Sequence, residues 1–121
     1  MAVILIVEDE PFTRELAGIC IDAWGHDTLF ADSIEDALVH VRSGKAIDAL
    51  FTDINLREAT LGGCDLAREA IVLHPKLRVL YTTGNSATEE LKSLFVSGAH
   101  FLSKPYTPDQ LQTGVAALLE A

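Results

Sequence analysis

The chain has 121 residues, of which 49% are hydrophobic, so it has the size and composition of one globular domain that needs no disulfide or metal to fold. Its net charge of −9 argues against direct contact with nucleic acid, because a duplex-binding surface needs a basic stripe that nine scattered Lys and Arg residues do not readily supply. The longest apolar run, residues 2–7, is far shorter than the roughly 20 residues of a membrane span and precedes no signal-peptide pattern, so we expect a cytoplasmic protein without membrane contact.

Apolar runs and helical periodicities alternate along the chain. The run 2–7 is rich in β-branched residues and lacks polar alternation, as in a strand buried on both faces of a parallel sheet. Pro11 fits the first turn of a helix, whose apolar face we expect to include Phe12, Leu16 and Ile19. The first half is thus predicted to contain a strand over 2–7, a helix over 11–23, a strand over 28–31, a helix from an N-cap at Ser33 to near Gly44, and a strand over 46–52.

The second half continues this alternation after a loop over residues 54–63. A third helix is expected to end before His74 and Pro75, because the residue preceding a proline is pushed out of helical geometry. Gly98 is expected to end a fourth helix, and Pro108 suits the first position of the last one. The predicted elements are a helix with Leu66, Ala67, Ala70, Ile71 and Leu73 on its apolar face, a strand over 77–82, a helix marked by Ala87, Leu91, Leu94 and Phe95, a strand over 101–103, and a helix from Thr107 presenting Leu111, Val115, Leu118 and Leu119.

Strands that alternate with helices indicate an α/β domain with a doubly wound parallel sheet, because parallel neighbours need a crossover and the helix supplies it. We expect residues 1–121 to form one such domain. Sheets of this kind place their sites outside the carboxyl ends of the strands. The residues predicted at those ends are Glu8, Asp9 and Glu10 after the first strand, Asp53 after the third, Thr83 after the fourth and Lys104 after the fifth.

Acidic residues from the first and third strands are therefore expected to meet in one crevice. Like charges at close range are costly unless a cation neutralises them. Mg²⁺ prefers oxygen ligands and is usually held by one or two carboxylates together with phosphate oxygens. We expect Asp9 and Asp53 to be direct ligands of Mg²⁺. The backbone carbonyl of Asn55 and a direct or water-mediated contact from Glu8 would complete the site.

A carboxylate beside such an ion can itself act as a nucleophile and form an aspartyl phosphate. We predict this role for Asp53. The hydroxyl of Thr83 and the ammonium group of Lys104 are suited to bind the remaining phosphoryl oxygens. Each signal is weak when taken singly, but mutually compatible groups at all four strand ends form a specific pattern, since phosphoryl transfer asks for little beyond positioning and charge stabilisation.

Four motifs in fixed order and spacing carry a family resemblance. They are Ile6-Val7-Glu8-Asp9-Glu10, Thr52-Asp53, Thr82-Thr83-Gly84, and Gly98-Ala99 through Phe101 to Lys104-Pro105-Tyr106. With them the chain resembles, over essentially its full length, the receiver domain of two-component response regulators. The resemblance implies a flavodoxin-like (βα)5 fold with strand order 2-1-3-4-5. It also implies Mg²⁺-dependent transfer of a phosphoryl group to Asp53 from a histidine kinase or histidine phosphotransfer protein, followed by hydrolysis that resets the switch.

The resemblance further implies a readout of phosphorylation. Thr83 would move toward the phosphoryl group while Phe101 turns inward behind it, although Phe101 is equally well interpreted as an ordinary core aromatic residue. A downstream protein would bind the surface formed by the fourth helix, the fifth strand and the fifth helix. The resemblance also implies a cis peptide bond between Lys104 and Pro105.

The segment after Asp53 departs from the family pattern. It lacks the proline that the family commonly carries four residues past the acceptor, where Arg57 stands instead, and the loop is about two residues longer than usual. Glu8 in place of the more frequent aspartate keeps the charge. Asn55 and Asn85 occupy positions at which the family tunes dephosphorylation.

Two rival functions remain open at this point. A degenerate receiver would act as a docking module without phosphoryl chemistry, but the site is complete. A magnesium phosphohydrolase would need a second carboxylate two residues past the nucleophile, where Asn55 stands, and an amide cannot shuttle a proton. We therefore expect the chain to catalyse its own phosphorylation and dephosphorylation without turning over outside substrates. It would act alone, as chemotaxis-type regulators do, or as a phosphate shuttle, or it would be a receiver cut from a larger protein such as a hybrid kinase.

Overall fold

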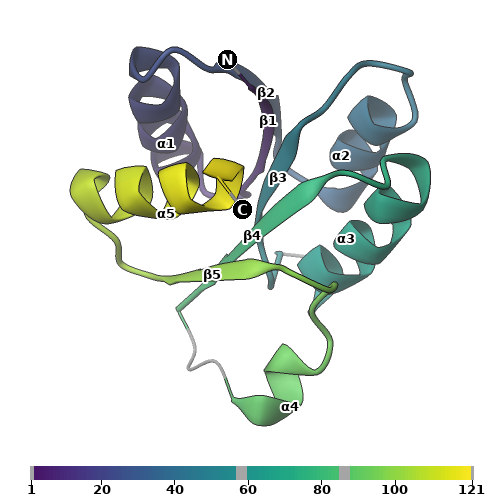
Figure 1. Ribbon diagram of the computed structural model, residues 1–121. Coiled ribbons are helices and arrows are strands. Elements are labelled where there is room, and N and C mark those ends of the chain that lie inside the picture. The colour runs from purple at the N-terminus through teal and green to yellow at the C-terminus, as the bar shows by residue number, and fades with distance from the viewer. Residues whose placement is uncertain (1, 57–59, 85–87, 121) are drawn as a thin grey trace.

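A computed structural model describes residues 2–56, 60–84 and 88–120 of the chain. The strands are β1 (Val3–Val7), β2 (Asp27–Ala31), β3 (Ala49–Asp53), β4 (Arg78–Thr83) and β5 (His100–Ser103). The helices are α1 (Pro11–Ala23), α2 (Ile34–Val41), α3 (Gly62–Leu73), α4 (Glu89–Lys92) and α5 (Pro108–Glu120). The strands form one parallel sheet in the order β2-β1-β3-β4-β5, with α1 and α5 on one face and α2 and α3 on the other (Figure 1). The predicted fold class and strand order are confirmed.

Several predicted boundaries are confirmed by their capping contacts. The side chain of Glu10 accepts hydrogen bonds from the backbone N–H groups at the start of α1, so this acid serves as the N-cap of the helix. The Ser33 hydroxyl accepts from the N–H of Asp36 at 3.1 Å, as predicted for α2. Helix α3 ends at Leu73, directly before the predicted boundary. The third strand begins later than predicted, at Ala49.

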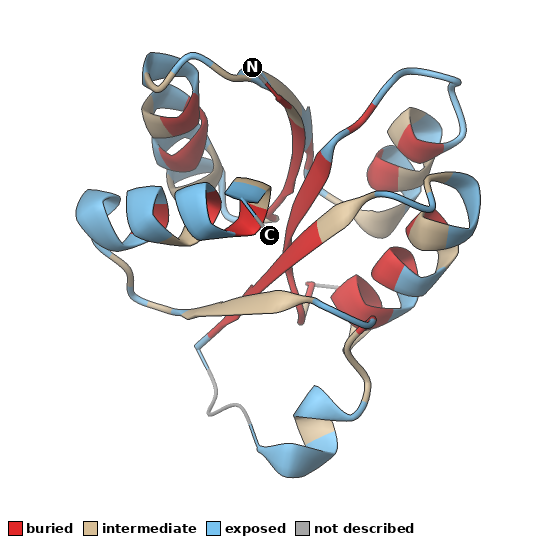
Figure 2. Ribbon diagram, in the orientation of Figure 1, coloured by how far each residue is buried: buried red, intermediate tan, exposed pale blue. Residues whose placement is uncertain are grey.

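The central strand β3 is buried on both faces (Figure 2). Leu50 belongs to the core cluster under α2 and α3, and its neighbour Phe51 belongs to the cluster under α1 and α5. Successive side chains of a strand point to opposite faces, so two adjacent apolar residues anchor β3 in both layers. The last residue of this strand, Asp53, is thereby presented at the carboxyl edge on a rigid support.

The predicted apolar face of α1 is wrong. Phe12, Leu16 and Ile19 are 72%, 42% and 67% exposed, whereas Ala17 and Ile21 are buried. Helix α1 packs on the sheet through Ala17, Gly18 and Ile21 instead. The exposed fraction of Leu73 on α3, 51%, shows that its predicted place on an apolar face is also wrong.

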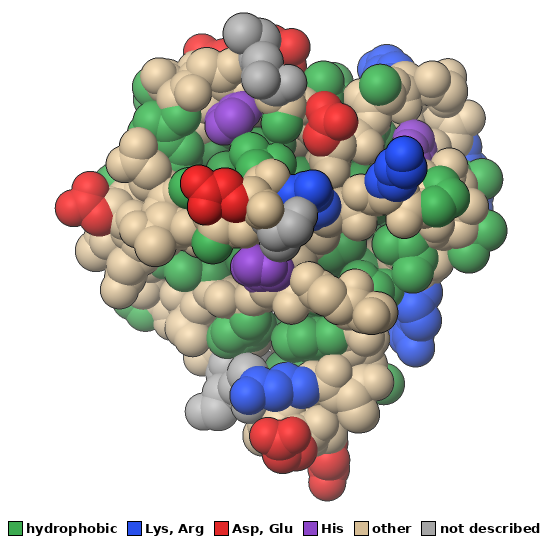
Figure 3. Space-filling model, in the orientation of Figure 1, with side chains coloured by type: hydrophobic (Ala, Val, Ile, Leu, Met, Phe, Trp, Pro, Cys, Tyr) green, Lys and Arg blue, Asp and Glu red, His purple; other side chains and the backbone are tan. Residues whose placement is uncertain are grey.

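Helix α4 is much shorter than the predicted fourth helix. It covers only Glu89–Lys92, with the hydroxyl of Thr88 accepting from the N–H of Leu91 at 3.1 Å. Its acidic first turn lies at a tip of the molecule where acidic side chains gather (Figure 3). Ala87 lies outside the described residues, and Phe95 lies beyond the end of the helix.

An aromatic stack and one hydrogen bond hold the segment that follows α4 against the sheet. The ring of Phe95 packs against Tyr81 of β4, with a centroid distance of 4.3 Å, and against Phe101 of β5 at 6.0 Å. The buried hydroxyl of Tyr81 accepts a hydrogen bond from the N–H of Val96 at 3.2 Å. This N–H group is therefore held by the sheet rather than by a helical carbonyl.

The variant Tyr81→Phe tests this anchor. It keeps the aromatic ring and leaves the buried N–H of Val96 without its acceptor, which should lower the free energy of unfolding by about 1–2 kcal/mol. Urea unfolding measures this loss. Hydrogen exchange shows where the stability is lost. The Val96 amide should exchange faster by local opening, whereas the amides of β1 should change only by the loss in global stability. Unchanged exchange at Val96 would contradict the anchoring role.

Candidate functional site

Backbone hydrogen bonds between neighbouring strands continue past the strand ends and position two of the predicted site residues. The N–H of Glu8 donates to the carbonyl of Ala31 at 3.1 Å, directly after β1 ends. The N–H of Lys104 donates to the carbonyl of Thr83 at 3.0 Å, directly after β5 ends. These bonds hold Glu8 and Lys104 at the carboxyl edge of the sheet, the edge at which β3 presents Asp53.

Three carboxylates meet at this edge as predicted. Glu8, Asp9 and Asp53 each offer one oxygen, and these oxygens lie within 4.8 Å of one another. Glu8 and Asp53 are 4% and 7% exposed, so water screens their repulsion poorly. All of these donors are hard oxygen atoms, the type that Mg²⁺ prefers. This acidic trio could hold a divalent metal ion.

Lys104 lies between two members of the acidic trio. Its ammonium nitrogen is 2.5 Å from Oε1 of Glu8 and 3.0 Å from Oδ2 of Asp53. The second oxygen of Glu8, Oε2, accepts the N–H of Glu10 at 3.1 Å. The fifth strand therefore supplies a positive charge to the acids of the first and third strands, across 96 and 51 residues of sequence.

The pKa values of Glu8, Asp53 and Lys104 reflect two opposing effects, burial and the hydrogen bonds among the three side chains. Burial raises the pKa of Glu8 and of Asp53, and the hydrogen bonds from Lys104 lower each of them in part. For Lys104 burial alone would lower the pKa, but bonds to Glu8 and Asp53 outweigh it and leave the pKa raised. The ammonium group therefore stays charged at neutral pH and opposes the effect of burial on the pKa of both carboxyl groups.

Thr83 and Asn55, the other residues predicted near Asp53, also lie at this edge. Thr83 is the last residue of β4 and is 2% exposed. The backbone N–H of Asn55 donates to the carboxyl group of Asp53 and lowers its pKa. The side chain of Asn55 points elsewhere, since its Oδ1 accepts the N–H of Leu61 at 2.9 Å. Arg57 and Asn85, singled out from the sequence, lie outside the described residues.

The structure shows the surroundings of Phe101 and the geometry of the bond between Lys104 and Pro105, while the switch role of Phe101 stays a prediction. Phe101 is partly buried on the α3 side of the sheet, where it stacks on Phe95. The Lys104-Pro105 peptide bond is cis.

Sequence reasoning missed the role of two aromatic residues near the site. Tyr81 anchors the segment after α4, as described above. The ring of Tyr106 packs on Phe51 at 6.0 Å, and burial with the nearby charge of Glu8 raises the pKa of its hydroxyl to about 12. The role of Tyr81 could have been predicted from its place in the apolar run of β4, because a tyrosine hydroxyl that is buried needs a hydrogen-bond partner.

The doubly wound sheet, the acidic trio at its carboxyl edge and the opposing lysine define a class of α/β protein with a charged site at the strand ends. Residues 4–116 match the model of the family described as response regulator receiver domain. The chain belongs to this family and is a receiver domain of two-component signalling.

Curated relatives agree with this assignment. The chain is 30% identical over 118 residues to the alginate biosynthesis transcriptional regulatory protein AlgB of Pseudomonas aeruginosa, covering 97% of this chain and 26% of that protein. It is 29% identical over 110 residues to the transcriptional regulatory protein ZraR of Escherichia coli O157:H7, covering 90% of this chain and 24% of ZraR. The chain thus spans about a quarter of the length of these relatives.

Solved structures agree as well. A response regulator receiver protein from Sinorhizobium medicae WSM419 superposes with a TM-score of 0.90 at 31% identity, covering 99% of this chain and 95% of that one. NtrX from Brucella abortus, in complex with ATP, superposes with a TM-score of 0.86 at 32% identity, covering 98% of this chain and 27% of that one.

Over the described part of the chain, no helix has the length and apolarity needed to cross a bilayer.

Proposed function

We propose that the chain is a phosphorylation switch that accepts a phosphoryl group on Asp53 from a phosphohistidine of a histidine kinase or phosphotransfer protein. The observation that carries this proposal is the position of the Asp53 carboxylate, 3.0 Å from the Lys104 ammonium group and within the acidic trio. One carboxylate oxygen of Asp53 would form the new P–O bond. The P–N bond to the donor imidazole breaks, and its electron pair stays on the imidazole nitrogen.

The residues around Asp53 would divide the work of this transfer. Glu8, Asp9, Asp53 and the backbone carbonyl of Asn55 would hold Mg²⁺, which offsets the negative charge of the phosphoryl oxygens when bound. Lys104 and the hydroxyl of Thr83 would bind the remaining phosphoryl oxygens. We assign Lys104 the further role of transmitting phosphorylation of Asp53, as a structural change, to the segment that follows β5.

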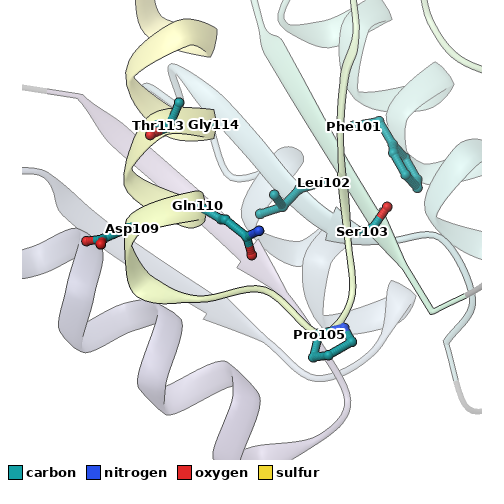
Figure 4. A pocket seen from close by; sticks show the side chains of 8 residues that line it. All are labelled: Phe101, Leu102, Ser103, Pro105, Asp109, Gln110, Thr113 and Gly114. Carbon is teal, nitrogen blue, oxygen red and sulfur yellow. The ribbon is translucent and has the colours of Figure 1, made fainter.

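The output would be a change in the surface formed by α4, β5 and α5, with Thr83 and Phe101 as its switch residues. This surface contains a groove between β5 and α5, in which Leu102 points toward α5 and Phe101 points to the opposite side of β5 (Figure 4). A downstream protein would bind there, and contact with nucleic acid or membrane is not part of the proposal. Receiver domains of related regulators are linked to effector domains, and we propose that residues 1–121 act as one such receiver.

A cytoplasmic location belongs to the same proposal. Response regulators are generally cytoplasmic, and Cys20 and Cys64 are free thiols, as expected in a reducing compartment.

Intact-mass measurement tests the switch. Incubation with a small phosphodonor and Mg²⁺ should add one phosphoryl group to the protein, and omission of Mg²⁺ or addition of a chelator should prevent it. The absence of any magnesium-dependent mass shift would leave the docking module without phosphoryl chemistry as the better reading. No observation favours that reading now, since the acids and the lysine lie together. Turnover of outside phosphate esters is disfavoured because Asn55 offers no carboxylate.

A further inference from the structure

The first turn of α3 lies directly against the peptide that carries Asp53. A Cβ atom built on Gly63 would lie 2.1 Å from the carbonyl oxygen of Asp53 and 2.9 Å from Cα of Ile54. Both are backbone atoms, so they cannot turn aside as the tip of a flexible side chain can. Any residue larger than glycine at position 63 must therefore displace either α3 or the end of β3.

Two hydrogen bonds tie the start of α3 to the end of β3. The N–H of Gly63 donates to the carbonyl of Ile54 at 2.9 Å, and the N–H of Leu61 donates to the side chain of Asn55 at 2.9 Å. Leu61 adopts φ 60°, the left-handed region, which costs a non-glycine residue roughly 1–2 kcal/mol. Its side chain nevertheless packs against the core cluster under α2 and α3. The junction therefore holds a strained residue in place, as expected where surrounding contacts over-determine the backbone.

The geometry points to Gly63 as a positioning residue for the phosphoryl transfer at Asp53. This inference rests on the proposed function of Asp53. The missing side chain lets α3 sit against the acceptor's own peptide and fixes that peptide at the edge of the sheet. A methyl group at position 63 would require about 1 Å of displacement before ordinary contact distances were restored, shared between the first turn of α3 and the Asp53 peptide. The part of this shift taken by the peptide would move the Asp53 carboxylate from its place beside Lys104 and within the acidic trio.

Gly63→Ala tests this inference, with Gly18→Ala as the matched control. Gly18 also lies in a helix, α1, but a Cβ atom there would meet the ring of Phe30, at 2.5 Å, and this side chain is 43% exposed and can turn aside. Both proteins are compared with the wild type for the initial rate of phosphorylation by a small phosphodonor, for the Mg²⁺ dissociation constant and for far-ultraviolet circular dichroism. In Gly63→Ala the rate should fall, by up to about 100-fold for a misplacement of about 1 Å, and Mg²⁺ should bind more weakly. Gly18→Ala should match the wild type in rate and in Mg²⁺ affinity.

A merely structural role would lower the melting temperature of Gly63→Ala without changing the Mg²⁺ affinity of the folded protein. Rate and Mg²⁺ affinity equal to those of a reactive wild type would overturn the inference. If the wild type itself takes up no phosphoryl group, the proposed function fails while the Mg²⁺ titration still decides whether Gly63 positions Asp53. Should Gly63→Ala not fold, Asn55→Ala loosens the same junction without added volume. Weaker Mg²⁺ binding in Asn55→Ala supports the inference, and unchanged binding overturns it.

Discussion

Asp53→Ala should take up no phosphoryl group under conditions in which the wild type takes up one. Asp53 ends the central strand, and its carboxylate combines a 3.0 Å contact to Lys104 with a place in the acidic trio. The loss should therefore be complete rather than partial.

Intact-mass measurement with a small phosphodonor and Mg²⁺ checks this expectation. Asp22→Ala serves as the control, because Asp22 is an exposed aspartate on α1, outside the acidic trio. A mass shift that survives in Asp53→Ala would move the acceptor role to another residue. Loss of the mass shift in Asp22→Ala as well would show that the assay does not report phosphorylation of Asp53.

Lys104→Ala should destabilise the metal-free protein by about 2 kcal/mol at neutral pH, because it leaves two buried carboxylates without their counter-charge. This figure lies below that for a fully buried pair, since the side chain of Lys104 is 24% exposed and water screens part of the interaction. Lys45→Ala, at an exposed position, should have almost no effect.

The pH dependence of this loss has a definite sign. Burial already raises the pKa of Glu8 and Asp53 above the ordinary values of 4.5 and 3.8, and removal of Lys104 takes away an effect that lowers both. The folded variant then retains protons that the unfolded chain releases. Its stability should therefore fall as the pH rises above about 4, more steeply than in the wild type. Urea unfolding in the presence of a chelator at pH 5 and pH 7 measures the difference, and equal slopes would contradict the role of Lys104 as counter-charge.

Mg²⁺ and phosphorylation add two readouts for the same variant. With Lys104 removed, Mg²⁺ should raise the melting temperature more than it does in the wild type, because the carboxylates have lost their competing cation. Lys104→Ala should still accept a phosphoryl group but show smaller chemical-shift changes on phosphorylation. Equal changes in variant and wild type would count against Lys104 as the link to the segment after β5.

The alternation of strands and helices was predictable because it depends on short-range patterns. The run 2–7 and the periodicity of residues 11–23 each indicate their own element, and Ser33 and Pro75 mark boundaries through local backbone chemistry. The meeting of Glu8, Asp53 and Lys104 followed from a single rule, namely that parallel strands bring their carboxyl ends to one edge.

The sequence did not predict contacts that depend on which surfaces meet. Periodicity gives α1 two apolar stripes, and only packing against the sheet selects the one with Ala17 and Ile21 over the one with Phe12. In the segment that follows α4, the hydroxyl of Tyr81 holds the N–H of Val96, a partner 15 residues away. No local pattern records such a bond.

By itself the sequence determined the fold class and the chemical identity of the groups at the strand ends, because these follow from periodicity and from residue type. The strand order was implied only by the resemblance to the receiver family. The tertiary structure decided how those groups contact one another: that Lys104 bridges Glu8 and Asp53, that Asn55 turns its side chain to Leu61, and that Gly63 lies against the Asp53 peptide. The physical reason is that distances of this order are set by backbone segments far apart in the chain, whose approach depends on how the whole core packs.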